Sequence, residues 1–207
     1  MKKAVFFDFD GTLVNLNISW NKDKIFKILE QSGFRPNKNR PITEQVSKFH
    51  QFIKNKNEKV LNILFNFIKQ NEQKFLQGIK NPSLTLQELF KSLKRKNYLI
   101  VIISRNHTST IKKGLQKVGI SADRIFGIDT LTKLKPQVDP KIFQFIKKNQ
   151  IELKKSFMVG DACYDMEFAD KIGLKKILMI NPNLKKHFTR FADFVIKDIQ
   201  ELSKILK

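Results

Sequence analysis

The fold is decided by the stretch Ala4-Val5-Phe6-Phe7-Asp8-Phe9-Asp10-Gly11-Thr12, near the beginning of the chain. Its first four residues form an uninterrupted apolar run, which is typical of a strand buried on both faces of a parallel sheet. Two carboxyl groups follow, and Gly11 permits a sharp turn. Asp10 and Gly11 could be ordinary turn residues. Asp8 is harder to explain in this way, because a carboxylate at a buried strand is costly unless it is paired or bound to a metal.

Similar apolar runs recur along the chain. They occupy residues 99–103, 125–126, 157–159, 177–180 and 194–196. Between the runs, apolar residues recur at helical spacing in segments 84–96, 108–118 and 139–149. This alternation predicts an α/β fold, a Rossmann-like, doubly wound parallel sheet with right-handed crossovers.

Residues 16–82 break the alternation, since they contain no strand-like run. Their apolar spacing predicts three helices, at about 20–31, 42–54 and 58–77. A simple crossover helix would need far fewer residues. We therefore predict a helical module inserted at 16–82, with 1–15 and 83–207 forming the α/β core.

Polar residues at the ends of the predicted strands are the candidates for function, because open parallel sheets bind ligands there. Ser104-Arg105-Asn106 follows the second run. A serine hydroxyl with exposed backbone N–H groups can hold a phosphoryl oxygen, although serine is also an ordinary helix cap. Lys135 precedes Pro136, which favours an extended backbone and would hold its ammonium group in a defined place.

The fourth run also ends in a carboxylate, Asp161, and a second one, Asp165, follows near the start of a helix. Mg²⁺ takes oxygen ligands and usually keeps several waters, so it needs few carboxylates. Asp8 and Asp161 on adjacent strand ends would make such a site.

Taken in order, four segments resemble the signature motifs of the haloacid dehalogenase superfamily of phosphatases and phosphotransferases. They are FFDFDGT (6–12), VIISRN (101–106), KLKP (133–136) and MVGDACYD (158–165). The resemblance extends from residue 4 to about residue 181. The insert at 16–82 resembles the helical cap of the phosphoglycolate phosphatase and β-phosphoglucomutase branch.

The resemblance implies a role for each catalytic candidate. Asp8 would be the nucleophile that forms an aspartyl-phosphate. Asp10 would be the general acid and base. Ser104 would hold the phosphoryl group, and Lys135 would balance the charge and orient Asp8.

The resemblance also implies a Mg²⁺ cofactor and a set of substrate contacts. The ion would be bound by the Asp8 carboxylate, the Asp10 backbone carbonyl and Asp161, with Asp165 as a ligand or a support. The implied substrate-binding residues are Phe9, Gly11, Thr12, Arg105 and Asn106.

The expected activity is Mg²⁺-dependent hydrolysis of a small phosphorylated metabolite. Asp10 argues against a dehalogenase, whose leaving halide needs no proton, and against a P-type ATPase, which carries Thr there. Thr12 favours a phosphatase over a phosphomutase, since the mutase branch usually carries Val at that place. The phosphomutase, and a basic nucleic-acid-binding module or nucleic-acid-end phosphatase, are the alternatives.

Four residues of the insert are candidates to select the substrate, and each has a competing structural explanation. They are Trp20, Arg35, Arg40 and His50. Residues such as Trp20 and His50 more often serve in packing or lie on a helix surface than contact a substrate.

The bulk composition limits the partners. The 207 residues carry a net charge of +21, which would attract phosphates and nucleic acid. However, 34 of the 40 basic residues are lysines scattered along the chain, a pattern that also fits a genome-wide coding bias. Nucleic acid is therefore possible but not favoured.

Cys163 is the only cysteine, which fits a reducing compartment. No apolar run reaches the roughly 18 residues of a membrane span, so we expect no membrane partner. We also expect a cytoplasmic protein and a monomer.

Overall fold

The first apolar run forms the centre of a six-stranded parallel sheet. The computed structural model describes residues 1–40, 42–53, 57–79, 83–180 and 186–206. The strands are β1 (Lys3–Phe7), β2 (Tyr98–Ile103), β3 (Arg124–Phe126), β4 (Phe157–Gly160), β5 (Lys175–Met179) and β6 (Phe194–Ile196). Their order is β3-β2-β1-β4-β5-β6, so the direction of winding reverses between β1 and β4. A crevice at such a reversal is where doubly wound sheets bind ligands.

Eight α-helices and three 3₁₀ helices accompany the strands in the described part of the chain. The α-helices are α1 (Lys22–Glu30), α2 (Ile42–Ile53), α3 (Glu58–Leu76), α4 (Leu84–Arg95), α5 (Thr108–Val118), α6 (Pro140–Lys148), α7 (Cys163–Ile172) and α8 (Leu202–Ile205). The 3₁₀ helices are η1 (Leu153–Lys155), η2 (Lys186–Phe191) and η3 (Ile199–Glu201).

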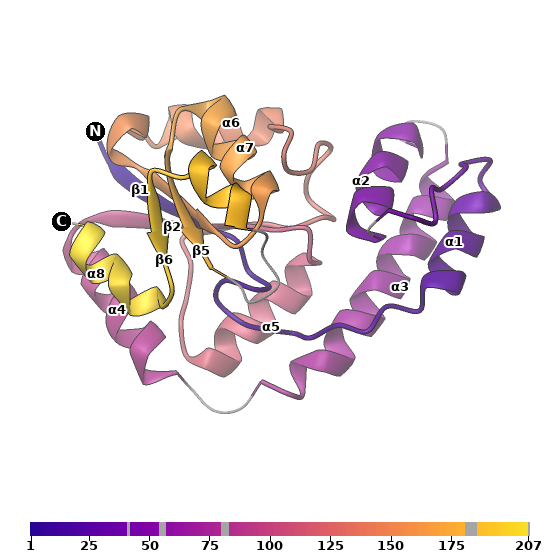
Figure 1. The fold of residues 1–207 in the computed structure, drawn as a ribbon, viewed down its shortest axis with the longest axis horizontal. Coiled ribbons are helices and arrows are strands. Elements are labelled where there is room, and N and C mark those ends of the chain that lie inside the picture. Colours follow the sequence, from indigo (N-terminus) through magenta and orange to yellow (C-terminus); the bar gives the residue numbers. More distant parts are fainter. Residues whose placement is uncertain (41, 54–56, 80–82, 181–185, 207) are drawn as a thin grey trace.

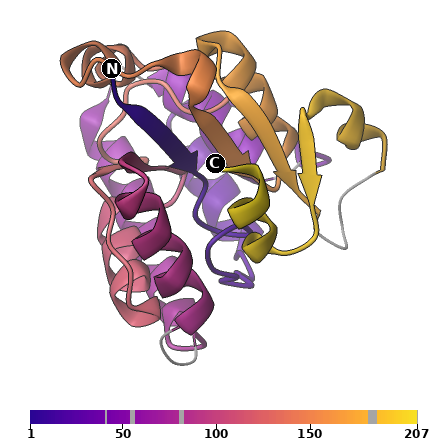
Figure 2. The same cartoon turned by 90° about the vertical axis from the view of Figure 1, so that its left-hand side faces the viewer.

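The two faces of the sheet are covered by different helices (Figure 2). Side chains alternate along a strand, so Phe6 and Phe7 of β1 enter two separate clusters. Phe6 lies in the cluster of α6 and α7, and Phe7 lies in the cluster of α4, α5 and α8. Burial on both faces explains why the strands read as continuous apolar runs.

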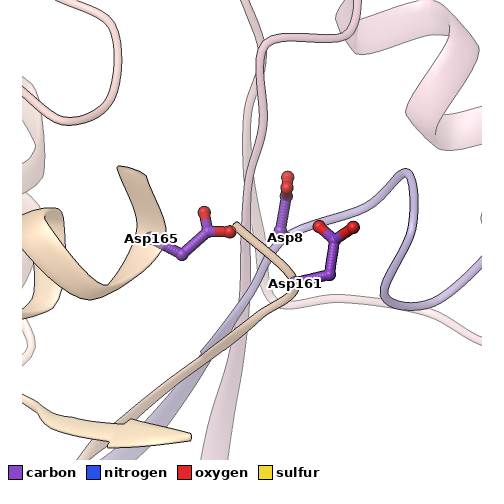
Figure 3. A group of neighbouring side chains, drawn as sticks. All are labelled: Asp8, Asp161 and Asp165. Atoms are coloured by element: carbon purple, nitrogen blue, oxygen red, sulfur yellow. The ribbon is translucent and has the colours of Figure 1, made fainter. Parts of the chain in front are cut away.

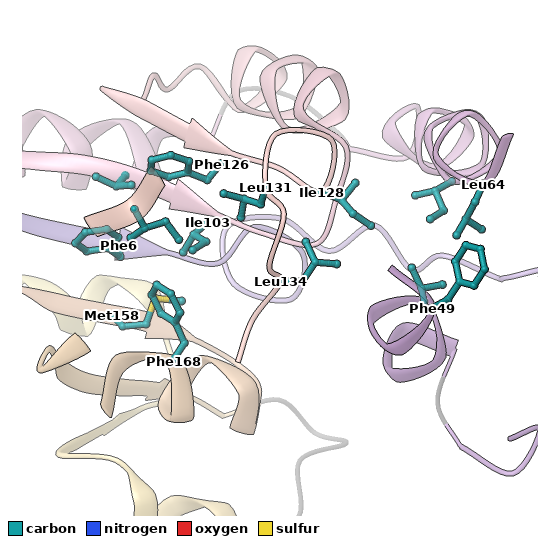
Figure 4. Close-up of a cluster of buried hydrophobic side chains, with 14 of the residues drawn as sticks. Phe6, Phe49, Leu64, Ile103, Phe126, Ile128, Leu131, Leu134, Met158 and Phe168 are labelled. Atoms are coloured by element: carbon teal, nitrogen blue, oxygen red, sulfur yellow. The ribbon is translucent and has the colours of Figure 1, made fainter. Parts of the chain in front are cut away.

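A helical module (α1, α2 and α3) lies to one side of the sheet and follows β1 in the chain (Figure 1). Apolar side chains of the module, which include Phe49 and Leu64, belong to the same buried cluster as Phe6 (Figure 4). Its link to the core includes packing of α3 on α5. Gly114 makes this approach possible, because a Cβ there would lie 2.4 Å from Cζ of Phe9 and 3.3 Å from Cδ2 of Leu76.

The predicted fold class is confirmed, since the structure has the parallel, doubly wound α/β sheet with a helical insert between β1 and β2. The boundaries at 15/16 and 82/83 stay a prediction, and residues 80–82 lie outside the described part. Among the described residues, no helix is long and apolar enough to cross a membrane.

Candidate active site

Three carboxylates meet where β1 and β4 end. The backbone N–H of Asp8 donates to the carbonyl of Val159 at 2.9 Å, which holds the end of β1 against β4. Asp8, Asp161 and Asp165 each offer an oxygen, and these oxygens lie within 4.8 Å of one another (Figure 3). The sheet order produces this meeting, because residues 8 and 161 follow neighbouring parallel strands.

Two glycines make room for the carboxylates. Gly11 has a φ of +85°, and a Cβ at this position would lie 2.3 Å from Oδ2 of Asp161. A Cβ on Gly160 would lie 2.3 Å from Cγ of Asp165. Real side chains cannot approach so closely, so both positions require glycine for a reason of space, and Gly11 also for its backbone conformation.

Lys135 neutralises part of this negative charge. Its ammonium lies 3.0 Å from Oδ1 of Asp8 and is hydrogen-bonded to Oδ1 of Asp165, and only 3% of its side chain is exposed. Burial alone would lower the pKa of Lys135, but the two carboxylates raise it above its usual value. The other oxygen of Asp165 accepts from the N–H of Ala162 at 3.1 Å. Asp165 therefore holds Lys135 in place against Asp8.

Asp10 lies in the turn after β1 and has a different environment. Its Oδ1 accepts a hydrogen bond from the N–H of Leu16 at 2.8 Å. Burial raises its pKa to about 6, and the nearby carboxylates of Asp8 and Asp161 act in the same direction. A carboxyl with such a pKa can give up and regain a proton near neutral pH, as a general acid and base must.

Ser104 lies at the end of β2, where its N–H donates to the carbonyl of Phe126 at 3.0 Å. Its hydroxyl donates to Oδ1 of Asn106 at 2.8 Å. Arg105 stands between Ser104 and Asn106 in the sequence. Its guanidinium lies 4.6 Å from the ring centre of Tyr164, and this cation–π contact orients the guanidinium.

A cavity of about 220 Å³ lies between the strand ends and the helical module. The core lines it with Asp8, Asp10, Ser104, Arg105, Asn106, Ile128, Asp161 and Ala162. Trp20 and residues of α2 and α3 line the opposite side: Ile42, Val46, Ile68 and Glu72. The cavity thus brings together six of the predicted site residues from segments up to 153 positions apart, as for Asp8 and Asp161.

Some predicted residues lie behind or away from the cavity. Thr12 is buried, and its hydroxyl has no hydrogen-bond partner among the described residues. The N–H of Phe9 donates to Oδ1 of Asp8, and that of Gly11 donates to the carbonyl of Val14. Their roles in substrate binding stay predictions.

Of the four candidates in the insert, only Trp20 lines the cavity. Arg35 and Arg40 are exposed elsewhere on the surface. His50 is buried in α2, and its ring stacks on that of Phe65.

The sequence reasoning missed Glu72, a carboxyl of α3 that lines the cavity and is 1% exposed. Burial raises its pKa to about 7, against the opposing effect of hydrogen bonds from His107 and Asn106. A signal was present, because Leu64, Ile68, Glu72 and Leu76 recur every four residues on the buried face of α3. A carboxyl inside an apolar stripe indicates a polar partner across the interface.

The cluster could hold a divalent cation. Asp8 and Asp161 offer carboxylate oxygens side by side, and Mg²⁺ prefers this kind of ligand. The space that Gly11 leaves at Asp161 brings that carboxylate close to the turn of Asp10. Asp165 fits a supporting role better, because Lys135 and the N–H of Ala162 occupy both of its oxygens.

A parallel sheet that gathers carboxylates, a lysine and a serine at one edge, under a helical module, defines a hydrolase of the phosphatase type. Residues 5–179 match the sequence model of the haloacid dehalogenase-like hydrolases, and the chain belongs to this family. The predicted family resemblance is thereby confirmed.

One curated relative supports the phosphatase class, and two solved structures share the fold. The chain is 27% identical to a phosphoserine phosphatase of Methanocaldococcus jannaschii, over 100% of this chain and 98% of that protein. A solved β-phosphoglucomutase of Clostridium difficile is 16% identical, with a TM-score of 0.61 over 98% of this chain and 93% of that one. A phospho-aspartyl intermediate analogue of phosphoserine phosphatase is 23% identical, with a TM-score of 0.57 over 100% of this chain and 99% of that one.

Proposed function

We propose that this protein is a Mg²⁺-dependent phosphatase that hydrolyses a small phosphomonoester through an aspartyl-phosphate on Asp8. The observation that carries the proposal is the environment of Asp8. Its carboxylate lines the cavity, lies 3.0 Å from the ammonium of Lys135 and shares its surroundings with Asp161. A carboxylate held in this way can approach an anionic phosphate that it would otherwise repel.

In the first step, an oxygen of Asp8 attacks phosphorus and the bond from phosphorus to the ester oxygen breaks. Asp10 gives its proton to the departing alcohol, which the raised pKa of Asp10 favours. In the second step, Asp10 takes a proton from water, the water oxygen attacks the phosphorus of the aspartyl-phosphate, and the bond from phosphorus to the Asp8 oxygen breaks. Inorganic phosphate leaves, and both carboxyl groups return to their starting states.

Asp8, Asp161 and the backbone carbonyl of Asp10 would hold Mg²⁺, and Asp165 would support them. A bound divalent cation supplies positive charge that offsets the repulsion between nucleophile and phosphate. Lys135 supplies a further positive charge, 3.0 Å from Oδ1 of Asp8. Ser104 would contact the transferring phosphoryl group.

A small substrate suits the cavity, since its volume of about 220 Å³ is modest. The helical module contributes mainly apolar side chains, with Trp20 beside them. Arg105 is the cavity's cationic side chain among the described residues, and its place beside the strand ends suits an anionic part of the substrate.

The test is a panel of phosphorylated metabolites, including p-nitrophenyl phosphate, phosphoserine and a hexose 1-phosphate, with Mg²⁺ or with EDTA. We expect inorganic phosphate to be released only with Mg²⁺. Conversion of a hexose 1-phosphate to an isomeric sugar phosphate would instead identify a phosphomutase.

The substitution Asp8→Asn keeps the shape of the nucleophile and removes its charge. We expect kcat to fall by about 10³-fold or more, because attack on phosphorus requires the carboxylate. Asp170→Asn is the matched control, since Asp170 lies exposed on α7, and it should retain full activity. An active Asp8→Asn protein would refute the mechanism.

A further inference from the structure

Glu72 joins the helical module to the loop that follows β2. It lies near the end of α3, on the buried face of that helix. Its Oε1 accepts from Nδ2 of Asn106 at 3.0 Å, and its Oε2 accepts from the N–H of His107 at 3.0 Å. Both acceptor atoms are thus used by the core, so this carboxyl is a connection between two parts of the molecule.

The hydrogen bonds continue from Asn106 to Ser104. Because the amide N–H₂ of Asn106 faces Glu72, its Oδ1 faces Ser104 and accepts the serine hydroxyl at 2.8 Å. The N–H of Asn106 also donates to Oγ of Ser104 at 3.3 Å. Oγ therefore makes two hydrogen bonds with Asn106, and Ser104 lines the cavity where the phosphoryl group would bind.

We propose that Glu72 is a positioning residue for phosphoryl transfer, which acts through Asn106 to hold the Ser104 hydroxyl at the phosphoryl site. The proposal rests on the phosphatase function above. When phosphate arrives, the hydroxyl can turn its hydrogen toward a phosphoryl oxygen, while the N–H of Asn106 keeps Oγ in place.

One consequence concerns the helical module. Asn106 and His107 belong to the core, whereas Glu72 belongs to α3. The Ser104 hydroxyl is therefore fully supported only while α3 is docked on α5. The module would then complete the phosphoryl site as well as cover it.

Two substitutions separate positioning from charge. Glu72→Leu suits the apolar stripe but leaves Nδ2 of Asn106 and the N–H of His107 without this acceptor, and we expect kcat/KM to fall about tenfold or more. Glu72→Gln can keep the series of hydrogen bonds if the side-chain amide of Asn106 flips. The side chain of Gln at position 72 then accepts from the N–H of His107 and donates to Oδ1 of Asn106, and the N–H₂ of Asn106 donates to Oγ of Ser104. We expect it to stay within about threefold of the wild type.

Glu58→Leu is the matched control, because Glu58 lies exposed in the first turn of the same helix. It should change kcat/KM by less than about twofold. Equal losses in Glu72→Leu and Glu72→Gln would mean that the charge matters and not the hydrogen-bond chain, and would overturn the proposal.

A double-mutant cycle tests the route through Ser104. In a Ser104→Ala background, Glu72→Leu should cost less than about twofold, because the group it positions is already gone. Equal losses in both backgrounds would contradict the proposal. Inhibition by inorganic phosphate gives a second measurement: its inhibition constant should rise in Glu72→Leu and not in Glu72→Gln.

The two proposals can fail separately. If no phosphorylated compound is hydrolysed by the wild type, the phosphatase function fails before Glu72 is tested. If the wild type is active and the cycle is additive, only the role of Glu72 fails. Circular dichroism would reveal whether Glu72→Leu unfolds. In that case the test uses Glu72→Gln, compared in the wild-type and Ser104→Ala backgrounds, and its inhibition by inorganic phosphate. A loss of kcat/KM or of phosphate affinity above about threefold in Glu72→Gln would refute the role of Glu72.

Discussion

Lys135 shows how a buried charge is tolerated at the scale of one residue. Its ammonium is enclosed by the protein and faces carboxylates of two elements, the end of β1 and the start of α7. Taking such an ion out of water is costly unless its partners are well placed. The arrangement places a buried cation beside Asp8, whose side chain lines the cavity.

We expect Lys135→Met to lower kcat by about 10²-fold or more, because Asp8 loses the cation that balances and orients it. In metal-free buffer the variant should also lose about 3–5 kcal/mol of unfolding free energy, since Asp8 and Asp165 are left facing each other. Kinetic assays and urea titrations measure the two effects.

Lys133→Met provides the control for Lys135, because Lys133 lies two residues away with an exposed side chain. Its activity and stability should match the wild type. A Lys135→Met protein as stable as this control would contradict the view that Lys135 compensates buried carboxylates.

Asp10 gives the stability a dependence on pH. Its pKa is raised from 3.8 to about 6 in the folded state. Between these values the folded protein keeps a proton that the unfolded chain has released, so stability falls as the pH rises. In metal-free buffer we expect this loss to be about 1–3 kcal/mol.

The variant Asp10→Asn isolates the effect, because the amide does not titrate. Urea titrations of both proteins between about pH 4.5 and about pH 7.5 should show the variant gaining stability relative to the wild type as the pH rises. A constant difference across this range would mean that Asp10 keeps an ordinary pKa.

At the scale of elements, the turn after β1 determines whether the metal ligands can meet. Gly11 combines a left-handed backbone with a contact that leaves no room for a Cβ beside Asp161. Gly11→Ala should therefore weaken Mg²⁺ binding at least tenfold, roughly the effect of losing a well-placed ligand or its support. Isothermal titration with Mg²⁺ measures it.

Gly173→Ala is the control for this turn. Gly173 ends α7 with a φ of +79°, but no atom of the described residues lies within 4 Å of the place that a Cβ would take there. The substitution should cost about 1 kcal/mol of stability through backbone strain alone and leave Mg²⁺ affinity unchanged. Equal Mg²⁺ affinity in both variants would show that Asp161 does not need the space at Gly11.

At the scale of the whole molecule, the net charge of +21 acts against the compact state. Attractive pairs such as Lys38–Glu30 and Lys155–Glu152 lie at the surface, where each contributes little. Salt screens the exposed charges, whereas the buried group around Lys135 is screened much less.

We therefore expect the melting temperature to rise by a few degrees as sodium chloride is raised from about 50 mM to about 500 mM, because repulsion weakens more than attraction. Differential scanning calorimetry in metal-free buffer measures the change. A melting temperature that falls with salt would mean that surface ion pairs outweigh the repulsion.

Much of the fold could be predicted from the sequence because burial on both faces leaves a plain pattern. The apolar run at 99–103 became β2, and the spacing in 58–77 became α3. Element ends moved by only one or two residues, as for β5, which begins at Lys175 instead of 177. Lys175 and Lys176 lie at the start of the strand, where burial is incomplete, so hydropathy alone did not include them.

The sequence by itself determined the strands, most of the helices and which polar residues follow the strand ends, because these depend on local periodicity and on short motifs such as Asp8-Phe9-Asp10. Only the tertiary structure decided that Lys135 is shared between Asp8 and Asp165, that Trp20 and not His50 reaches the cavity, and that Glu72 bonds to Asn106. These contacts depend on how α3 docks against the core. That docking is set by the three-dimensional fit of distant surfaces, such as Gly114 against Leu76, which no local pattern of residues records.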